Sequence, residues 1–462
     1  MLTRIIRHET LIFLIILSVV LRLPSLFEPY WYGDEGIYLT LGQALKQGLV
    51  WYRDIHDNKP PLLYLLAAIA GTVFWFRLLL MVWFGTTVAV FYRLMQKLLP
   101  KTPAAWSLAT IIMIVLTTLF EGNIANAEIF IVLPVTTGIL LALKARPPWG
   151  LIGLLFSAGF LFKAPAAFDF LALLIWLLFW KRAKIKNLFS CVFGFSLPII
   201  LSIAYYTYQG AFTPYVRSAL MQNIGYLHSW GGGQSDLLIR LGVAILASLV
   251  VFRSLPLIWF VWAMFGALLS ARPYPHYLIQ PAMPLAILIT LFFFNQKKQQ
   301  KVLIAGVVMI AGIAYQQIHF WQYPVLGYYQ NFIKYLAGDK PLEDYRAWFD
   351  ERANQTYRLA GYIRQTTVLG EPIYIWGDEP YVYALANRLP VGRYTVAYHV
   401  VDFDGFNETM QAWDQNQPKL VAVMIYETRP FPELDARLAA DYALVATIDR
   451  ARVYRRLNGA KR

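Results

Sequence analysis

The 462-residue sequence has little cysteine and little charge. Its one cysteine, Cys191, lies in an apolar run without a partner, so a disulfide framework and a cysteine metal site are excluded and a buried thiol is expected. Only 15% of the residues are charged, whereas 58% are hydrophobic and 16% are aromatic. Ordinary globular domains are more polar than this. The surplus of apolar surface needs a lipid solvent, which predicts a membrane protein.

The net charge of +14 raises nucleic-acid binding as a hypothesis, but the placement of the basic residues argues against it. Fifteen of them lie in short gaps between long apolar runs, as in cytoplasmic loops under the positive-inside rule. They are Arg4, Arg7, Arg93, Lys97, Lys101, Lys144, Arg146, Lys181, Arg182, Lys184, Lys186, Arg253, Lys297, Lys298 and Lys301. These charges orient a chain in a membrane, and no nucleic-acid partner is expected.

Roughly eleven apolar runs have spanning or near-spanning length. They cover residues 10–27, 76–93, 104–120, 129–143, 149–163, 168–180, 188–208, 237–252, 255–270, 281–295 and 302–320. The first run follows two arginines but no small-residue cleavage site follows it, so it is expected to stay as a helix rather than be removed as a signal peptide. With the N-terminus inside, eleven crossings put the basic gaps in the cytoplasm. An additional crossing at 60–75 would break this agreement, so that segment is expected to be an interfacial or re-entrant helix on the outer face.

The composition changes after Tyr323, where charged residues return. Short apolar stretches at 372–376, 420–425 and 443–448 predict strands, and helical patterns lie near 379–387, 406–416 and 432–440. No glycine-rich phosphate loop follows a strand, so nucleotide chemistry is not expected. The predicted fold is an all-α polytopic membrane protein of about eleven transmembrane helices (1–322) with a small C-terminal α/β domain (323–462) on the extracytoplasmic side.

The first outer loop (28–75) carries the strongest chemical signal. Asp34 and Glu35 are adjacent carboxylates beside an apolar helix, which costs desolvation energy unless something uses or neutralises them. A hydrated loop with a helix-capping acid is the plain alternative. The functional hypothesis is a catalytic pair in which Asp34 is the general base that takes the proton of an attacking hydroxyl, and Glu35 either supports Asp34 from behind or orients the acceptor. Lys59 precedes two prolines at headgroup depth, where it either binds a lipid phosphate or only anchors a helix.

Later outer loops supply further polar groups. Arg272 and His276 lie at the mouth of two helices and, with Lys59, would clamp a phosphate that gains charge as it leaves. Amides and acids at 121–128 suit sugar hydroxyls, although helix capping explains Asn126 nearly as well. The residues assigned to the sugar or the acceptor are Tyr38, Asp57, Asn126, Glu128 and His228. The glycine-containing loop 209–236, which holds His228, is either a gating or acceptor loop or a solvated linker.

No metal is assigned, because no ligand spacing is diagnostic. A divalent metal held among His56, Asp57, His228 and His276 stays open as an alternative.

The run Gly33-Asp-Glu-Gly-Ile-Tyr38 followed by Asp57-Asn-Lys-Pro-Pro-Leu62 resembles the dolichyl-phosphate-mannose protein mannosyltransferase-like family. This family includes bacterial lipid A aminoarabinose transferases and galacturonosyltransferases of lipopolysaccharide cores. Later landmarks of the resemblance are Arg77, the segment 121–128, Gly159 to Lys163 and Arg272 to Pro284, so that it covers roughly residues 10–320.

The resemblance implies a GT-C fold, a polyprenyl-phosphate-sugar donor and inversion at the anomeric carbon. By motif match it implies that Asp34 is the base and Lys59 a ligand of the donor phosphate. In two places the chain departs from the pattern. Asn58 stands where aminoarabinose transferases carry a glutamate, which argues against a zinc site there, and the short C-terminal domain leaves the acceptor open.

We therefore expect a hexosyl- or pentosyltransferase of the inner (plasma) membrane, with its active site on the extracytoplasmic side. Its partners would be a polyprenyl-phosphate sugar, membrane lipid and a glycan, lipid or protein acceptor. The alternative is a transporter or flippase of lipid-linked sugars, which would place charges midway through several helices and show internal repeats. A third hypothesis, a scaffold that displays the C-terminal domain, does not account for the polar loops.

Overall fold

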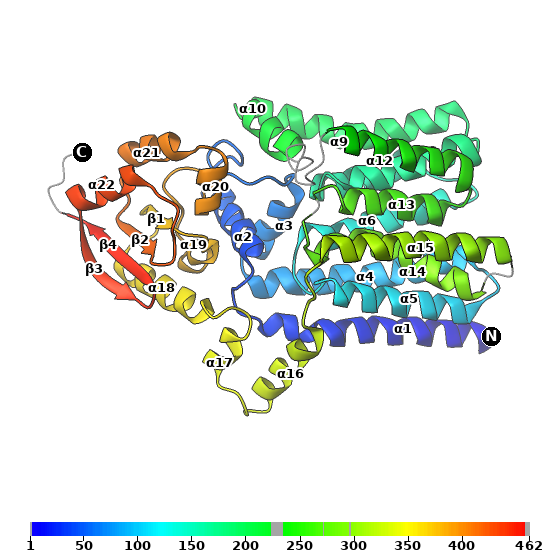
Figure 1. The fold of residues 1–462 in the computed structure, drawn as a ribbon, viewed down its shortest axis with the longest axis horizontal. Helices are drawn as coiled ribbons and strands as arrows, with labels where there is room; N and C mark the ends of the chain where they lie inside the picture. The colour runs from blue at the N-terminus through cyan, green and yellow to red at the C-terminus, as the bar shows by residue number, and fades with distance from the viewer. Residues whose placement is uncertain (1, 223–233, 271, 295–296, 458–462) are drawn as a thin grey trace.

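The computed structural model describes residues 2–222, 234–270, 272–294 and 297–457. It has two parts, a bundle of long helices and a small domain with a sheet at one end of the bundle (Figure 1). Two helices of the first loop, α2 (Gly33–Lys46) and α3 (Leu62–Ala70), lie between these parts. The N-terminus lies at the far end of the bundle and the C-terminal domain at the other (Figure 1).

The bundle contains eleven apolar helical segments among the residues with assigned structure, which confirms the predicted number. Five are long and apolar enough to cross a membrane, and six are shorter. The long segments are His8–Phe27 in α1 (Leu2–Arg22) and η1 (Leu23–Phe27), α4 (Val73–Leu98), α9 (Ile185–Tyr208), Pro275–Phe294 in η6 (Pro275–Leu278) and α14 (Ile279–Phe294), and α15 (Lys298–Ile318). The shorter ones are α5 (Pro103–Leu119), α6 (Ala127–Ala142), α7 (Trp149–Phe162), α8 (Ala166–Ile175) with η2 (Trp176–Trp180), α12 (Gln234–Leu246) with η5 (Ala247–Val251), and α13 (Leu255–Ala267). A short α10 (Phe212–Tyr215) and η3 (Val216–Met221) follow α9.

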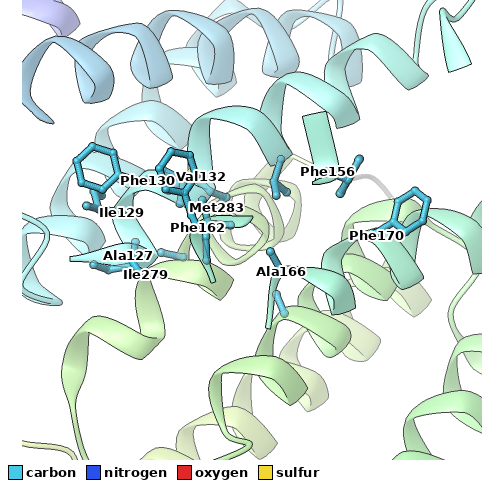
Figure 2. Packing of buried hydrophobic residues seen from close by; sticks show 14 of the residues in the cluster. Ala127, Ile129, Phe130, Val132, Phe156, Phe162, Ala166, Phe170, Ile279 and Met283 are labelled. Carbon is cyan, nitrogen blue, oxygen red and sulfur yellow. The ribbon is translucent and has the colours of Figure 1, made fainter. Parts of the chain in front are cut away.

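The centre of the bundle is packed by aromatic and aliphatic side chains (Figure 2). Phe130 stacks between Phe76 and Phe162, with ring centroids 5.6 Å away in both cases. Helices α7 and α9 touch through glycine: a Cβ on Gly153 would lie 2.0 Å from the carbonyl oxygen of Cys191, so only a hydrogen fits there. Cys191 is buried and free, as expected from the sequence.

The apolar segment 60–75 does not form a span. Its helix α3 has nine residues, about half of what a bilayer crossing requires, and it ends at Gly71, whose φ of +73° is left-handed. Helix α3 packs closely on α2, since a Cβ on Gly42 would lie 2.7 Å from the backbone nitrogen of Ala68. The polar turn at 47–61 is thereby fixed between two helices.

The C-terminal domain is built on a four-stranded sheet in the order β1-β2-β4-β3. Strand β1 (Ile373–Trp376) is parallel to β2 (Leu420–Met424), and β4 (Ala451–Arg456) is antiparallel to β2 and to β3 (Tyr442–Ile448). The helices after α15 are α16 (Val325–Leu336), α17 (Leu342–Ala347), α18 (Ala353–Thr366), α19 (Pro380–Ala386), α20 (Ala397–Asp402), α21 (Phe406–Gln415) and α22 (Pro432–Asp441).

The predicted strands correspond to β1, β2 and β3, and the predicted helices to α19, α21 and α22. Strand β4 was missed because three of its six residues are arginine, which hides the alternation of buried Ala451 and Val453.

Helix α2 is clamped against helix α19 of the C-terminal domain. Gly36 permits this contact, since a Cβ there would lie 2.8 Å from the backbone nitrogen of Tyr381. Thr40 donates a hydrogen bond to the carbonyl of Pro380 at 3.2 Å, and the Gln43 amide donates to the carbonyl of Ala384 at 2.7 Å. The helix that carries Asp34 and Glu35 is therefore held by both parts of the protein.

Candidate functional site

A cavity of about 840 Å³ lies between the bundle and the C-terminal domain. This volume is at the upper end of the range for small-molecule sites. Its walls come from the start of α2, the turn before α3, the first turn of α6, the α7–α8 turn, the end of α13, η6 and the C-terminal domain. The cavity thus collects polar groups from segments that are more than 300 residues apart in the sequence.

Asp34 faces this cavity from the first turn of α2, where a carboxylate is favoured by the helix dipole. Its side chain is 30% exposed. The Tyr38 hydroxyl donates a hydrogen bond to its Oδ2 at 3.0 Å, and the Lys59 Nζ lies 3.6 Å from the same oxygen. Burial raises the pKa of Asp34, but Lys59, His276 and the Tyr38 hydrogen bond outweigh burial and hold that pKa below its ordinary value. The carboxylate is therefore ionised at neutral pH and able to accept a proton.

Lys59 lies between two carboxylates. Its Nζ is 3.7 Å from Asp57 Oδ2 and 3.6 Å from Asp34 Oδ2, longer than a direct hydrogen bond to either. Asp57 is fixed by Tyr64, whose hydroxyl donates to it at 2.8 Å, and the backbone N–H of Lys59 donates to the same hydroxyl at 2.9 Å. The ammonium group is thus held in place on the cavity wall.

Glu35 lies on the other side of α2 and does not line the cavity. Its side chain is 2% exposed and makes two bonds to Arg77, 3.0 Å from Nε to Oε1 and 2.5 Å from Nη2 to Oε2. Arg77 Nη1 also contacts Glu28 at 2.5 Å, and the backbone N–H of Ala125 donates to Glu35 at 2.8 Å. One buried guanidinium thus joins α4 to Glu28 at the start of the first loop and to Glu35 in α2, and Glu35 orients α2 rather than a ligand.

A second polar group lines the cavity from the bundle. Glu128 forms an ion pair with Lys163, and Lys163 Nζ lies 4.2 Å from the ring centroid of Tyr277. His276 Nδ1 is 2.8 Å from Glu121 Oε2, which leaves Nε2, 3.8 Å from Glu128, toward the cavity. The segment Gly159 to Lys163, one of the landmarks of the family resemblance, therefore supplies a cation to the site.

Two residues assigned to the ligand lie behind the wall. Tyr38 is fully buried, and its hydroxyl contacts Asn126 Oδ1 at 3.0 Å as well as Asp34. Asn126 caps α6 and donates from Nδ2 to the Tyr32 hydroxyl at 3.1 Å. Both residues position Asp34 and Tyr32 instead of facing the cavity.

Among the other predicted site residues, Arg272 lines the cavity beside Tyr274, whereas His228 lies outside the part of the chain that the structure describes. Within the described ranges, no three His, Cys, Asp or Glu side chains are grouped as ligands for a metal ion.

The sequence analysis assigned no site residue to the C-terminal domain, yet this domain forms one wall of the cavity. Asp350, Arg352, Asp378, Tyr398 and His399 all line it. Their signal was hidden because they come from three separate short segments, at 350–352, at 378 and at 398–399, and only folding brings these segments to Asp34. The opposite wall is apolar toward the bundle, with Phe168, Leu220, Leu241, Phe265 and Leu269.

The sequence matches no family model and no curated protein. Solved structures do match the fold of the chain, which is that of a multi-pass membrane protein of the GT-C type. One is ArnT from Cupriavidus metallidurans bound to undecaprenyl phosphate, with a TM-score of 0.57 and 11% identity over 97% of this chain and 98% of that chain. The apo state of the same protein matches with a TM-score of 0.56 and 12% identity, over 96% and 97% of the two chains. The structural similarity, at 11% to 12% sequence identity, confirms the fold that the first-loop motifs imply.

Proposed function

We propose that the chain is a membrane glycosyltransferase that moves a sugar from a polyprenyl-phosphate carrier to a hydroxyl of a cell-envelope acceptor. The observation that carries the proposal is the pair of Asp34 and Lys59, 3.6 Å apart on the wall of a cavity next to the apolar bundle. A base and a fixed cation in one cavity are what an attack on a phosphate-linked sugar requires. The fold shared with a protein bound to undecaprenyl phosphate supports the same donor class.

In the proposed reaction Asp34 accepts the proton of the acceptor hydroxyl as its oxygen bonds to the anomeric carbon. The bond from that carbon to the phosphate oxygen breaks, and the electron pair goes to the phosphate. Lys59 and Arg272 oppose the added negative charge and His276 lies beside them as a hydrogen-bonding group, so they stabilise the transition state more than the bound donor. Attack from the face opposite the phosphate gives inversion. The apolar wall that includes Phe168 and Phe265 would take the first isoprene units.

The proposed orientation puts the cavity and the C-terminal domain on the extracytoplasmic side of the inner membrane. Its support is the charge distribution: Arg93 and Lys97 lie in the last two turns of α4 and Lys144 follows α6, in both cases at the end of the helix that is distant from the cavity. A reporter fused after Arg462 should then be active only outside the cytoplasm, and an active cytoplasmic reporter would contradict this orientation.

The donor class is tested by thermal stabilisation of the purified protein in lipid nanodiscs with added undecaprenyl phosphate. We expect a concentration-dependent rise in melting temperature. Lys59→Met and Arg272→Met should each lower the apparent affinity for undecaprenyl phosphate by about tenfold. Lys46→Met is the matched control, because Lys46 is an exposed lysine at the other end of α2. No stabilisation of the unsubstituted protein, or equal weakening by Lys46→Met, would contradict the proposal.

A further inference from the structure

The C-terminal domain supplies one part of the cavity wall, which we name the domain wall. Its charge pattern differs from that of the bundle side. The domain wall consists of Asp350, Arg352, Asp378 and Tyr398, which line the cavity, and of the buried Glu379 behind them. None of these groups has a task in the proposed reaction. They lie across the cavity from the cations of the bundle, where the acceptor must enter if the lipid-linked donor occupies the bundle side.

We propose that the domain wall binds a neutral, polyhydroxylated acceptor, a sugar ring of a glycan, and disfavours a phosphate-bearing one. This inference rests on the proposed function, because it names the class of acceptor for the same site.

The first support is that Arg352 of the domain wall is already neutralised, as is Arg429, which contacts Asp378 but does not line the cavity. Arg352 donates from Nε and Nη2 to Asp350 at 3.0 and 2.8 Å and from Nη1 to Glu379 at 3.2 Å. Arg429 donates to Asp378 at 2.7 Å and to Glu427 at 2.6 Å. Two guanidinium groups thus contact four carboxyl groups. Burial raises the pKa of Glu379 to about 7, and the other three carboxylates still outnumber the two cations, which gives an excess of negative charge that repels an anion.

The second support is hydrogen-bonding capacity. Asp378 accepts one bond at each oxygen, from the backbone N–H of Tyr398 at 3.1 Å and from Arg429, and each carboxylate oxygen has a second acceptor position. Asp350 Oδ1 accepts from both the backbone N–H and Nε of Arg352, so at this residue only Oδ2, which accepts from Nη2, has a position left for a hydroxyl. Carboxylate oxygens that are held in place in this way accept hydrogen bonds from hydroxyl groups but not from an ionised phosphate.

The third support is the aromatic surface next to these acids. Trp31, Phe349 and Tyr381 line the same part of the cavity, and the rings of Trp31 and Phe349 lie 5.7 Å apart. The Tyr381 hydroxyl donates to the carbonyl of Trp31, which fixes both residues. Flat apolar faces beside acceptor oxygens suit a sugar ring, which has an apolar C–H face and a rim of hydroxyls.

The test is saturation-transfer NMR on the full-length protein in lipid nanodiscs, with saturating undecaprenyl phosphate so that the proposed phosphate clamp of Lys59 and Arg272 is occupied. Three probes share one ring: methyl glucoside, glucose 6-phosphate and methyl glucosaminide. We expect contact with the neutral glycoside and at least about tenfold weaker contact with the phosphate. The double variant Asp350→Asn/Asp378→Asn leaves both arginines in place with less acid, so it should lose this preference. Asp449→Asn is the matched control, because Asp449 pairs with Arg358 at 2.8 Å on the surface of the same domain and does not line the cavity.

Any of four results would overturn the inference. The phosphate could contact the protein as strongly as the neutral glycoside or more strongly, or the cationic aminosugar could give the strongest contact. The neutral glycoside could give no contact, or the double variant could keep the preference. Stabilisation by undecaprenyl phosphate, measured in the same nanodiscs, separates the two proposals. If it persists while the sugar preference fails, only the acceptor class is wrong. If it is lost, the proposed function itself fails.

Discussion

Replacing Asp34 by asparagine tests the proposed chemistry with little disturbance of the fold. The amide keeps the shape of the carboxylate and can still accept the 3.0 Å hydrogen bond of Tyr38, and Lys59 keeps Asp57 at 3.7 Å. The variant loses the ability to take a proton at neutral pH. Loss of a general base lowers turnover by a factor of about 100 to 10,000, which corresponds to about 3 to 5 kcal/mol in the barrier.

The assay uses membrane vesicles from a strain that lacks the chromosomal copy, with each variant supplied in trans. Mass spectrometry of the envelope glycoconjugates first identifies the product that the deletion removes, and its rate of formation is then measured for each variant. Asp54→Asn is the matched control: Asp54 lies in the same loop, accepts from the backbone N–H of Val50 at 2.8 Å and pairs with Arg53 away from the cavity. Turnover by Asp34→Asn within a few-fold of the unsubstituted protein would refute Asp34 as the base.

Three further predictions concern the supports of the site. Arg77→Leu should destabilise the protein by about 3 to 5 kcal/mol, because it leaves Glu28 and Glu35 buried without a counter-charge. Adding Glu28→Gln and Glu35→Gln to this variant should recover part of the lost stability. Thermal denaturation measures both variants, and an Arg77→Leu variant as stable as the unsubstituted protein would contradict the role of this ion pair. Burial raises the pKa of Glu379 from 4.5 to about 7, so the folded state binds a proton that the unfolded state lacks and stability falls as pH rises through this window. Glu379→Gln removes that term, so the stability of the variant relative to the unsubstituted protein should rise by up to about 3 kcal/mol between pH 4.5 and 7, and a flat difference would contradict the assignment. Gly36→Ala should force α19 away from α2, lower the stability of the protein by about 1 to 3 kcal/mol and speed proteolysis of the C-terminal domain. Gly361→Ala is the control, because a Cβ at Gly361 meets no atom within 4 Å, and equal stability and proteolysis of the two variants would exclude the contact between α2 and α19 as a clamp.

The site also explains why one loop carries two acids side by side. Asp34 and Glu35 point to opposite sides of α2, one to the cavity and one to Arg77. Asp34 is kept ionised by groups at the cavity, such as Lys59, which a ligand would also contact. Glu35 is neutralised by Arg77 in the interior, away from the cavity. Chemistry and anchoring of α2 are thereby separated within two consecutive residues.

The bundle was predictable from the sequence because hydropathy is a local property. Apolar runs in the chain locate the eleven segments, and the basic residues between them exclude a twelfth crossing at 60–75, so the eleven segments and the short α3 follow from the chain alone. The candidate base and cation were also found locally, since Asp34 and Lys59 stand in one loop with prolines and aromatic residues that mark it. The arginine-rich β4 was missed because its pairing with β2 and β3, and not its own pattern, makes it a strand.

The tertiary structure decided what no local pattern contains. Glu35 is an anchor because Arg77, 42 residues further along the chain, reaches it in the interior, and burial makes that ion pair obligatory. Tyr38 and Asn126 became positioning residues because their hydroxyl and amide meet each other behind the wall. The wall of Asp350 and Asp378 exists only where Gly36 lets α19 approach α2, so the identity of the residues facing Asp34 depended on a contact between helices and not on the sequence around any one of them.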